Sequence, residues 1–425
     1  MKYLDVPASA LPEKKILRWL RNCRHACILH GNDYGSSYPQ LPFQKRMAGG
    51  NRSIEHFRES LPKKQDQSWW FGFLGYELHG KLPGDTRDAF LDFPPALFFE
   101  AEAVFEWRKN QIRIYALDPE KTAGEVSALE EYEFGPLPPI PAFTPSMQRK
   151  DYLQAVETVQ ELIREGHVYE LNLCQYYQSN AAPDGMDFYL QLNRKFPMPF
   201  SGWYRSGDFE IACASPERFL RRTGSELISQ PIKGTARRGG SEEEDRQIRY
   251  ELFHSEKERA ENMMIVDLVR NDLAKVSRTG STSVEEMFGI YAFPTVFQMI
   301  STVRSVVESN KTNAEVLDSA FPMGSMTGAP KQEVMKRIAE LEPLRRGAYS
   351  GSLGCFAQGS DFDFNVLIRS LFINHARKRC GFAVGSAITI DSDPAAEWEE
   401  CLTKAAALLS VCNSPTDLSE NQGKS

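Results

Sequence analysis

A proline-rich segment near the first third of this chain limits how its elements can be connected. The segment reads Phe134-Gly135-Pro136-Leu137-Pro138-Pro139-Ile140-Pro141. Each proline lacks the amide hydrogen that a helix interior or a central strand requires, and it biases the residue before it toward extended backbone. A continuous helix or central strand through this segment is therefore excluded. We expect a boundary here, with a linker over residues 135–146 that follows an N-terminal region, 1–134.

The composition is that of an ordinary globular enzyme. Hydrophobic residues make up 41% and charged residues 25% of the 425 residues, so the chain has enough apolar side chains for a large core. The formal net charge is −7. This composition argues against intrinsic disorder, which combines few apolar residues with high net charge. It also argues against a nucleic-acid partner, which requires a basic surface.

The sequence contains no stretch near the roughly 18 apolar residues of a membrane-spanning helix, and its first residues lack the apolar core of a secretory signal. The eight cysteines are scattered along a long chain, unlike those of a disulfide framework. We therefore expect reduced thiols in a cytoplasmic protein with no membrane partner. Cys23 and Cys27 flank His25, but no second ligand pair follows at zinc spacing, so we expect no zinc site.

Hydrophobic periodicity predicts the main elements. Before the boundary, aromatic-rich runs predict buried strands over 69–76 and 96–105. After it, the patterns predict helices over 150–166, 242–276 and 331–341, and strands over 168–177, 351–356, 364–373 and 382–390. The polar tail, 413–425, is expected to fray.

One acidic cluster begins where the last predicted strand ends. Asp393 is a suitable N-cap and Pro394 suits the first helical position, so a helix should start there. Glu397, Glu400 and Lys404 then fall on one face of that helix. A solvated charged face is the simpler interpretation of this pattern. A carboxylate site for a cation is the alternative.

A second acidic cluster lies in 255–273, where a polar helical turn runs directly into an apolar one. Glu261 stands at the edge of the expected burial. Carboxylates from two helices suit Mg²⁺, which accepts few protein ligands and keeps positions for water and substrate oxygens. Each cluster alone is a weak signal, and the two together make a magnesium site a hypothesis.

Two further segments invite a chemical interpretation. Gly324-Ser325-Met326-Thr327-Gly328-Ala329-Pro330-Lys331 has the wrong glycine spacing for a nucleotide phosphate loop, although its amides could hold another anion. In Gln230-Pro231-Ile232-Lys233-Gly234-Thr235, Lys233 follows a strand-like run at a glycine turn. It is either a surface charge or, in a pocket beside carboxylates, a base or amine nucleophile.

These segments, in this order, resemble the chorismate-utilising enzymes, which include the large subunits of anthranilate and aminodeoxychorismate synthases and, as cousins, isochorismate and salicylate synthases. The resemblance covers residues 147–412, which we expect to form the catalytic domain. It rests on Ala214 to Leu220, Pro231 to Thr235, Glu261 to Leu268, Gly324 to Lys331, Arg346 to Gly351, Phe364 to Arg369 and Glu397 to Lys404. The N-terminal third matches loosely and lacks the Leu-Leu-Glu-Ser element associated with tryptophan feedback.

The resemblance implies an α+β fold of α/β/β/α layers, in which two sheets pack between outer helices and the N-terminal region interleaves with the rest. It implies Mg²⁺ held by Glu261 and Glu400, bridging to the ring carboxylate of chorismate. Glu217 is implied as the general acid for the departing 4-hydroxyl. The residues implied to bind substrate are Gly234, Thr235, Thr327, Gly328, Tyr349, Arg369, Gly385 and Lys404.

Two positions separate the branches of the family. Isochorismate and salicylate synthases carry a water-activating lysine where this chain has Glu170. Anthranilate synthases resemble Pro-Ile-Ala-Gly-Thr, whereas aminodeoxychorismate synthases carry a lysine in that block, as Lys233 does here. For such a lysine, the resemblance implies attack by the amine at ring C2 with loss of the 4-hydroxyl. Ammonia then adds at C4 and expels the lysine.

The resemblance is therefore closest to the aminodeoxychorismate synthase branch, which implies chorismate and ammonia as substrates. Within these residues no Gly-x-Cys-x-Gly element of a glutaminase occurs, so we expect a glutamine amidotransferase subunit as partner. Anthranilate synthase component I and a catalytically silent chorismate-binding subunit are the alternatives. Two departures from the family stand out, because Glu170 replaces a usual Gln and Gln298 replaces a usual His.

Overall fold

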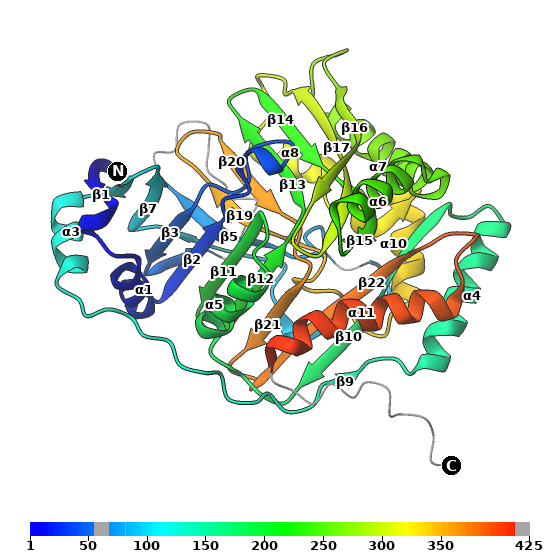
Figure 1. Cartoon of the computed structure of the whole chain (residues 1–425), viewed down its shortest axis with the longest axis horizontal. Helices are drawn as coiled ribbons and strands as arrows, with labels where there is room; N and C mark the ends of the chain where they lie inside the picture. The colour runs from blue at the N-terminus through cyan, green and yellow to red at the C-terminus, as the bar shows by residue number, and fades with distance from the viewer. Residues whose placement is uncertain (55–67, 81, 413–425) are drawn as a thin grey trace.

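Two large antiparallel sheets form the body of the molecule. A computed structural model describes residues 1–54, 68–80 and 82–412. In these residues one sheet has 12 strands and the other has 10. No helix in the described part of the chain has the length and apolar character needed to cross a membrane. Figure 1 shows the two sheets with helices on their outer sides.

The first sheet combines strands from the beginning and the end of the chain. Its spatial order is β1 (Lys2–Pro7), β8 (Gln111–Ala116), β7 (Ala103–Arg108), β3 (Arg46–Gly50), β2 (His25–His30), β11 (Phe200–Ser206), β12 (Phe209–Ser215), β21 (Ser370–Asn374), β22 (Arg379–Ile388), β10 (Glu170–Ser179) and β18 (Gly328–Ala329), with β9 (Thr144–Pro145) on β10.

The second sheet has the same mixed origin. Its order is β15 (Ile232–Arg237), β17 (Val296–Val306), β14 (Glu226–Gln230), β13 (Arg218–Thr223), β20 (Phe362–Asn365), β19 (Ser352–Phe356), β5 (Trp70–Leu74), β6 (Ala96–Glu100) and β4 (Arg52–Ile54), with β16 (Ser283–Ala292) on β17. In both sheets, strands from before the proline-rich segment pair directly with strands from after it, as β2 does with β11 and β5 with β19.

Helices cover the outer faces and one end. They are α1 (Glu13–Asn22), α3 (Pro119–Ser127), α4 (Arg149–Arg164), α5 (Gly185–Lys195), α6 (Glu242–His254), α7 (Glu256–Ala274), α8 (Asn313–Ala320), α9 (Gly324–Thr327), α10 (Lys331–Leu341) and α11 (Pro394–Cys412). Helices α4 and α11 lie beside β10 and β22, whereas α6 and α7 lie beside β15, β16 and β17 (Figure 1).

A continuous apolar core fills the space between the sheets. Tyr204 of β11 shows the contact, because its hydroxyl donates to the Leu97 carbonyl of β6 at 2.9 Å. Its ring also lies against Phe73 of β5 and Phe99 of β6, with ring centroids 5.6 and 6.0 Å away. Close packing of aromatic rings from both sheets holds them face to face. The layered α+β fold expected from the sequence is observed.

The predicted elements differ from the structure in three places. The helix predicted over 242–276 is two helices, because Ser255 ends α6 and caps α7 by accepting the Glu258 amide. The strand predicted over 364–373 is divided into β20 and β21, which belong to different sheets. The run 96–105 likewise forms two strands, β6 and β7.

The proline-rich segment contains neither helix nor strand over 130–143, as its prolines require. It nevertheless packs against the core, since Leu137, Ile140 and Phe143 are buried. The Ile140 amide also donates to the Cys412 carbonyl at the end of α11. The predicted tail, 413–425, lies outside the described residues. All eight cysteines are free thiols, as expected.

Candidate active site

A lysine and a glutamate from different sheets form a buried ion pair at the centre of the site. Lys233 of β15 donates from Nζ to Oε1 of Glu170, the first residue of β10, at 2.6 Å. The exposed fractions of the two side chains are 10% and 0%. Burial by itself opposes the ammonium charge, but the attraction of Glu170, Glu261 and Glu217 together outweighs it and raises the pKa of Lys233.

The backbone around Lys233 explains why its side chain points inward. The pairing of β15 with β17 shifts register between Ile232 and Thr235, a bulge that redirects the intervening residues. Asn262 of α7 donates to the Lys233 carbonyl at 3.3 Å. Gly234 has a φ of 96°, and a side chain there would come within 3.1 Å of Oε2 of Glu258. Helix α7 and this turn therefore fix the lysine.

Glu217 lies where the chain crosses from the first sheet to the second, between β12 and β13. Its side chain is buried, and Ser325 Oγ donates to its Oε1 at 2.7 Å. Burial raises the pKa of Glu217 to about 7, although the Ser325 hydrogen bond and the Lys233 charge act in the opposite direction. A carboxyl group in this state is a competent general acid near neutral pH.

The glycine-rich segment links Glu217 to Glu170. Its short helix α9 presents Ser325 to Glu217, and the following strand β18 pairs with the start of β10, placing Gly328 opposite Leu171. Gly328 has a φ of 132°, and a side chain there would overlap the Glu170 carbonyl oxygen. The Thr327 hydroxyl is buried and donates to the Met323 carbonyl at 3.2 Å. The glycine-rich segment therefore helps to position the carboxylates of Glu217 and Glu170.

Carboxylates of α7 and α11 interact electrostatically near this pair. Burial raises the pKa of Glu261 to about 7. The pKa of Glu258 is also raised, by burial and by repulsion from Glu400 and Glu397. Glu397 is buried and accepts from Ser392 at 2.8 Å, so the predicted charged face is partly internal. In the described residues no group of three or more His, Cys, Asp or Glu side chains has metal-binding geometry.

Lys404 connects the α11 carboxylates to the end of β22. Its Nζ lies 2.6 Å from Glu400 Oε1 and donates to the Gly385 carbonyl at 2.7 Å. Gly385 pairs with Cys174 of β10, whose Sγ lies 3.9 Å from the hydroxyl of Tyr349. Tyr349 is buried. The structure therefore joins the predicted residues Glu400, Lys404, Gly385 and Tyr349 through direct contacts or strand pairing.

Arg369 lies at another crossing between the sheets, between β20 and β21. It has a φ of 52°, and its carbonyl accepts from Ala214 near Glu217. Its guanidinium approaches Met198 Sδ at 3.9 Å and forms no ion pair with any described residue. Burial lowers the pKa of Arg369, which stays charged. A half-buried guanidinium without an ion-pair partner among the described residues is suited to a substrate carboxylate.

A second buried ion pair stabilises the elements that carry the site residues. Arg346 Nη2 lies 2.6 Å from Glu342 Oε1, and both side chains are almost fully buried. Tyr176 of β10 donates to the other Glu342 oxygen at 2.6 Å, and Arg346 donates to the Met326 carbonyl of α9 at 2.6 Å. This network ties β10 to α9, so the elements that carry Glu170 and Ser325 are held in register.

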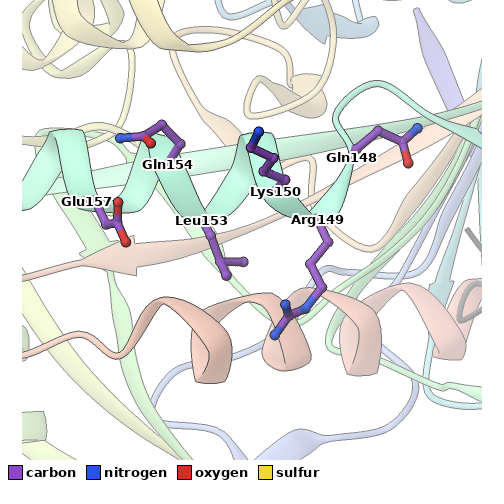
Figure 2. A pocket seen from close by; sticks show the side chains of 6 residues that line it. All are labelled: Gln148, Arg149, Lys150, Leu153, Gln154 and Glu157. Atoms are coloured by element: carbon purple, nitrogen blue, oxygen red, sulfur yellow. The ribbon is translucent and has the colours of Figure 1, made fainter. Parts of the chain in front are cut away.

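Thr235 is separate from the buried groups. It is exposed on β15, opposite Gln298 of β17. A surface hollow of about 560 Å³ is also separate from them. It lies on α4 near α11 and is lined by Gln148, Arg149, Lys150, Leu153, Gln154 and Glu157 (Figure 2). None of these six is a predicted site residue.

Sequence reasoning missed three contributors to the site. Glu170 was considered only as a departure from the family, Ser325 as part of a loop, and Glu258 as part of an acidic run. Glu258 precedes Glu261 by three residues, so helical spacing could have placed both on one side of α7. The contacts of Glu170 and Ser325 depend on strand pairing between distant segments, for which the sequence carries no local signal.

Known proteins provide an independent comparison. The chain is 40% identical over 275 residues to the probable aminodeoxychorismate synthase, chloroplastic, of Oryza sativa subsp. japonica, covering 63% of this chain and 30% of that protein. It is 33% identical over 416 residues to aminodeoxychorismate synthase component 1 of Bacillus subtilis, covering 88% and 87%. It is 35% identical over 353 residues to anthranilate synthase component 1 of Thermus thermophilus, covering 80% and 76%.

The fold has the same relatives. The crystal structure of anthranilate synthase component I from Streptococcus pneumoniae superposes with a TM-score of 0.71 at 25% identity, covering 91% of this chain and 92% of that one. Residues 26–410 match the family described as chorismate binding enzyme. The resemblance seen in the sequence is thereby confirmed, and the chain belongs to the chorismate binding enzyme family.

Proposed function

We propose that this protein is component I of an aminodeoxychorismate synthase, which converts chorismate and ammonia to 4-amino-4-deoxychorismate for the synthesis of 4-aminobenzoate and folate. The observation that carries the proposal is the buried amine of Lys233, held between carboxylates in the Pro-Ile-Lys-Gly-Thr block. An exposed lysine would be a solvated charge, whereas this one is near enough to the general-acid candidate Glu217 for its charge to lower the pKa of that carboxyl group. Relatives named aminodeoxychorismate synthase, matched at 33–40% identity, support the same assignment.

The roles of the other residues follow from their chemistry. Arg369 and Tyr349 hold the enolpyruvyl side of chorismate, for which the unpaired guanidinium provides a forked donor. Glu217 donates its proton to the 4-hydroxyl as that group departs. The nitrogen of Lys233 forms a bond to ring C2 as the ring double bonds shift and water leaves C4. Ammonia then bonds to C4, the double bonds shift back, and Lys233 leaves as the free amine.

Mg²⁺ is the cofactor we propose for this site. The donor set fits it, because Glu261 and Glu400 supply hard oxygen ligands and Mg²⁺ commonly takes only one or two carboxylates. The pKa values of Glu258 and Glu261 are raised mainly by burial and further by neighbouring carboxylates, and a divalent cation would favour the ionised form of both groups. When bound, the ion would neutralise and orient the ring carboxylate of chorismate.

The ammonia source is proposed to be a glutamine amidotransferase subunit. We propose a cytoplasmic location, where the free thiols of the chain would stay reduced. Purified protein supplied with ammonium should therefore work without the partner, whereas glutamine should support turnover only when an amidotransferase subunit is added. Turnover of glutamine by this chain alone would contradict the proposed partnership.

The deciding experiment identifies the product. The purified chain is incubated with chorismate, Mg²⁺ and ammonium, with and without an added aminodeoxychorismate lyase. The products are separated by chromatography and identified by mass spectrometry. We expect 4-aminobenzoate only when the lyase is present. Direct formation of anthranilate would instead favour the second candidate, anthranilate synthase component I, which the Thermus thermophilus relative supports. Unchanged chorismate would favour a silent subunit.

A further inference from the structure

We propose that Glu170 is the proton acceptor of Lys233, taking a proton from the ammonium before the nitrogen attacks substrate and returning it when the lysine leaves. This inference deepens the proposed function and rests on it, since it concerns the lysine assigned there as nucleophile. Lys233 Nζ is a reacting atom, and Glu170 touches it at 2.6 Å. Glu170 would therefore take part in the reaction directly and would not merely position another residue.

The geometry favours a proton-transfer role over a packing role. Glu170 has no exposed surface, and its Oε2 has no hydrogen-bond partner among the described residues. A carboxylate that served only to brace the sheet would be expected to use both oxygens, because an unsatisfied buried polar atom costs free energy. The side chain of Glu170 instead makes its hydrogen bond to Lys233 alone.

The chemistry requires such an acceptor. An ammonium has no lone pair, so Lys233 must lose a proton before it can form the bond to C2. Burial opposes the ammonium charge, but Glu170 holds it in place with smaller contributions from Glu261 and Glu217, so the pKa of Lys233 is raised. Glu217 is committed to the 4-hydroxyl in the proposed function. Glu170 is the carboxylate within hydrogen-bond distance of Nζ.

The proton account balances over one turnover. The starting state holds a Lys233 ammonium, a Glu170 carboxylate and a protonated Glu217. Transfer of one proton gives a neutral amine and a neutral Glu170. The amine bonds to C2, and the 4-hydroxyl leaves as water with the proton from Glu217. Ammonia bonds to C4, the lysine departs as an amine, Glu170 returns its proton, and the new C4 ammonium reprotonates Glu217.

This account predicts a distinctive pH dependence. In the wild type the proton moves within the Lys233 and Glu170 pair, so the reactive form needs no net loss of a proton to solvent. In Glu170→Gln the proton must be lost to solvent, and the reactive fraction grows about tenfold per pH unit below the pKa of Lys233. Titration of Glu217 is common to both proteins. Glu170 also raises the pKa of Glu261, so the two proteins are compared with Mg²⁺ in excess, which would keep Glu261 ionised in both.

The test measures formation of the covalent Lys233 adduct without ammonium. Each protein is mixed with chorismate and Mg²⁺ at pH 6, 7 and 8, quenched rapidly, and the adduct at Lys233 is quantified by peptide mass spectrometry. We expect Glu170→Gln to be at least ~100-fold slower than wild type at pH 6, and the ratio to fall about tenfold per pH unit. The exposed α4 variant Glu157→Gln is the control and should match the wild type.

The outcomes separate the two proposals. A ratio that stays constant with pH, or equal rates, would overturn the role of Glu170 while leaving Lys233 as nucleophile. Absence of an adduct in the wild type, together with full ammonium-dependent activity of Lys233→Ala, would overturn both. If Glu170→Gln does not fold, Glu170→Asp replaces it. That variant keeps an acceptor, so its rate should be lower by a factor that is constant with pH, and a tenfold slope would contradict the proposal.

Discussion

We propose different roles for two buried carboxylates of this site because their nearest neighbours differ. Glu217 has a hydroxyl as its hydrogen-bond donor, and burial holds its pKa at about 7. Glu170 is buried at least as deeply but contacts an ammonium. A neutral donor leaves a carboxyl group partly protonated and fit to give a proton, whereas a cation keeps it ionised and fit to accept one. Residue type alone would not distinguish the two.

The general-acid role of Glu217 predicts a specific pH effect. Its protonated form is the active one, so the rate of Lys233 adduct formation should fall as pH rises through about 7. The hydrogen bond from Ser325 lowers the pKa of Glu217. Ser325→Ala should therefore raise that pKa and shift the falling limb of the pH–rate profile, where the rate decreases, to higher pH. Below pH 7, Glu217→Gln should lose ~10²–10⁴-fold in rate relative to the wild type, and its rate should no longer fall as pH rises through 7. Adduct formation without ammonium is the measurement, and an unmoved limb in Ser325→Ala would contradict the assignment.

The proposed metal site predicts a pH-dependent change in stability. Burial raises the pKa of Glu261 to about 7, so Mg²⁺ must compete with a proton at pH 6 but not at pH 8. Thermal unfolding followed by calorimetry should therefore show a larger rise in midpoint with Mg²⁺ at pH 8. At 100 times the dissociation constant the stabilisation should be about 2.7 kcal/mol.

Neighbouring carboxylates on α11 provide the matched control for this metal prediction. Glu400→Gln should remove most of the Mg²⁺ effect, because Glu400 is a proposed ligand. Glu399→Gln, at an exposed position one residue earlier on the same helix, should keep it. Equal responses of the two variants, or an equal response at pH 6 and pH 8, would argue against the ligand assignment.

At the scale of elements, the site depends on the close approach of β18 to β10. Gly328 is the residue that permits this approach, since a side chain there would overlap the Glu170 carbonyl oxygen. We expect Gly328→Ala to displace α9 and β10 from one another, reducing activity severely and destabilising the fold by several kcal/mol. Activity with ammonium and chemical unfolding are the measurements.

Gly166 is the control for that prediction. It also has a positive φ, 79°, but a side chain there would meet nothing within 4 Å. Gly166→Ala should therefore lower the free energy of unfolding by only ~1–2 kcal/mol, because alanine disfavours a positive φ, and it should leave activity unchanged. If the two variants behaved alike, backbone strain rather than contact with β10 would explain the role of Gly328.

Local patterns predicted much of the fold, but not how distant elements meet. The helix over 331–341 and the start of α11 at Pro394 agree with the structure, because caps and periodicity are local signals. The break at Ser255 was missed although Ser255 and Glu258 have capping spacing. The contact between Lys233 and Glu170 spans 63 residues and two sheets, so it depends on tertiary packing that no local pattern encodes.

At the scale of the whole molecule, the two crossings that carry Glu217 and Arg369 depend on sheets shared by the two parts of the chain. Glu217 and Arg369 lie where the chain passes between the sheets. The first sheet needs β2 beside β11, and the second needs β5 beside β19. Residues before the proline-rich segment thus complete the sheets on which the site is built. Because strands from the two parts of the chain pair within each sheet, cutting the chain between these parts tests the interleaving that the family resemblance implies.

Cleavage at the proline-rich segment should leave the molecule assembled. Residues 133–136 are exposed, so a protease site inserted after Glu133 should be cut without unfolding. The two pieces should elute together in gel filtration, retain ammonium-dependent activity and separate only in denaturant, because strand pairing and the shared core hold them. Residues 147–425 expressed alone should instead aggregate, since β11 and β19 would expose unpaired edges. A soluble, active fragment of this kind would show that the N-terminal region is dispensable for the site.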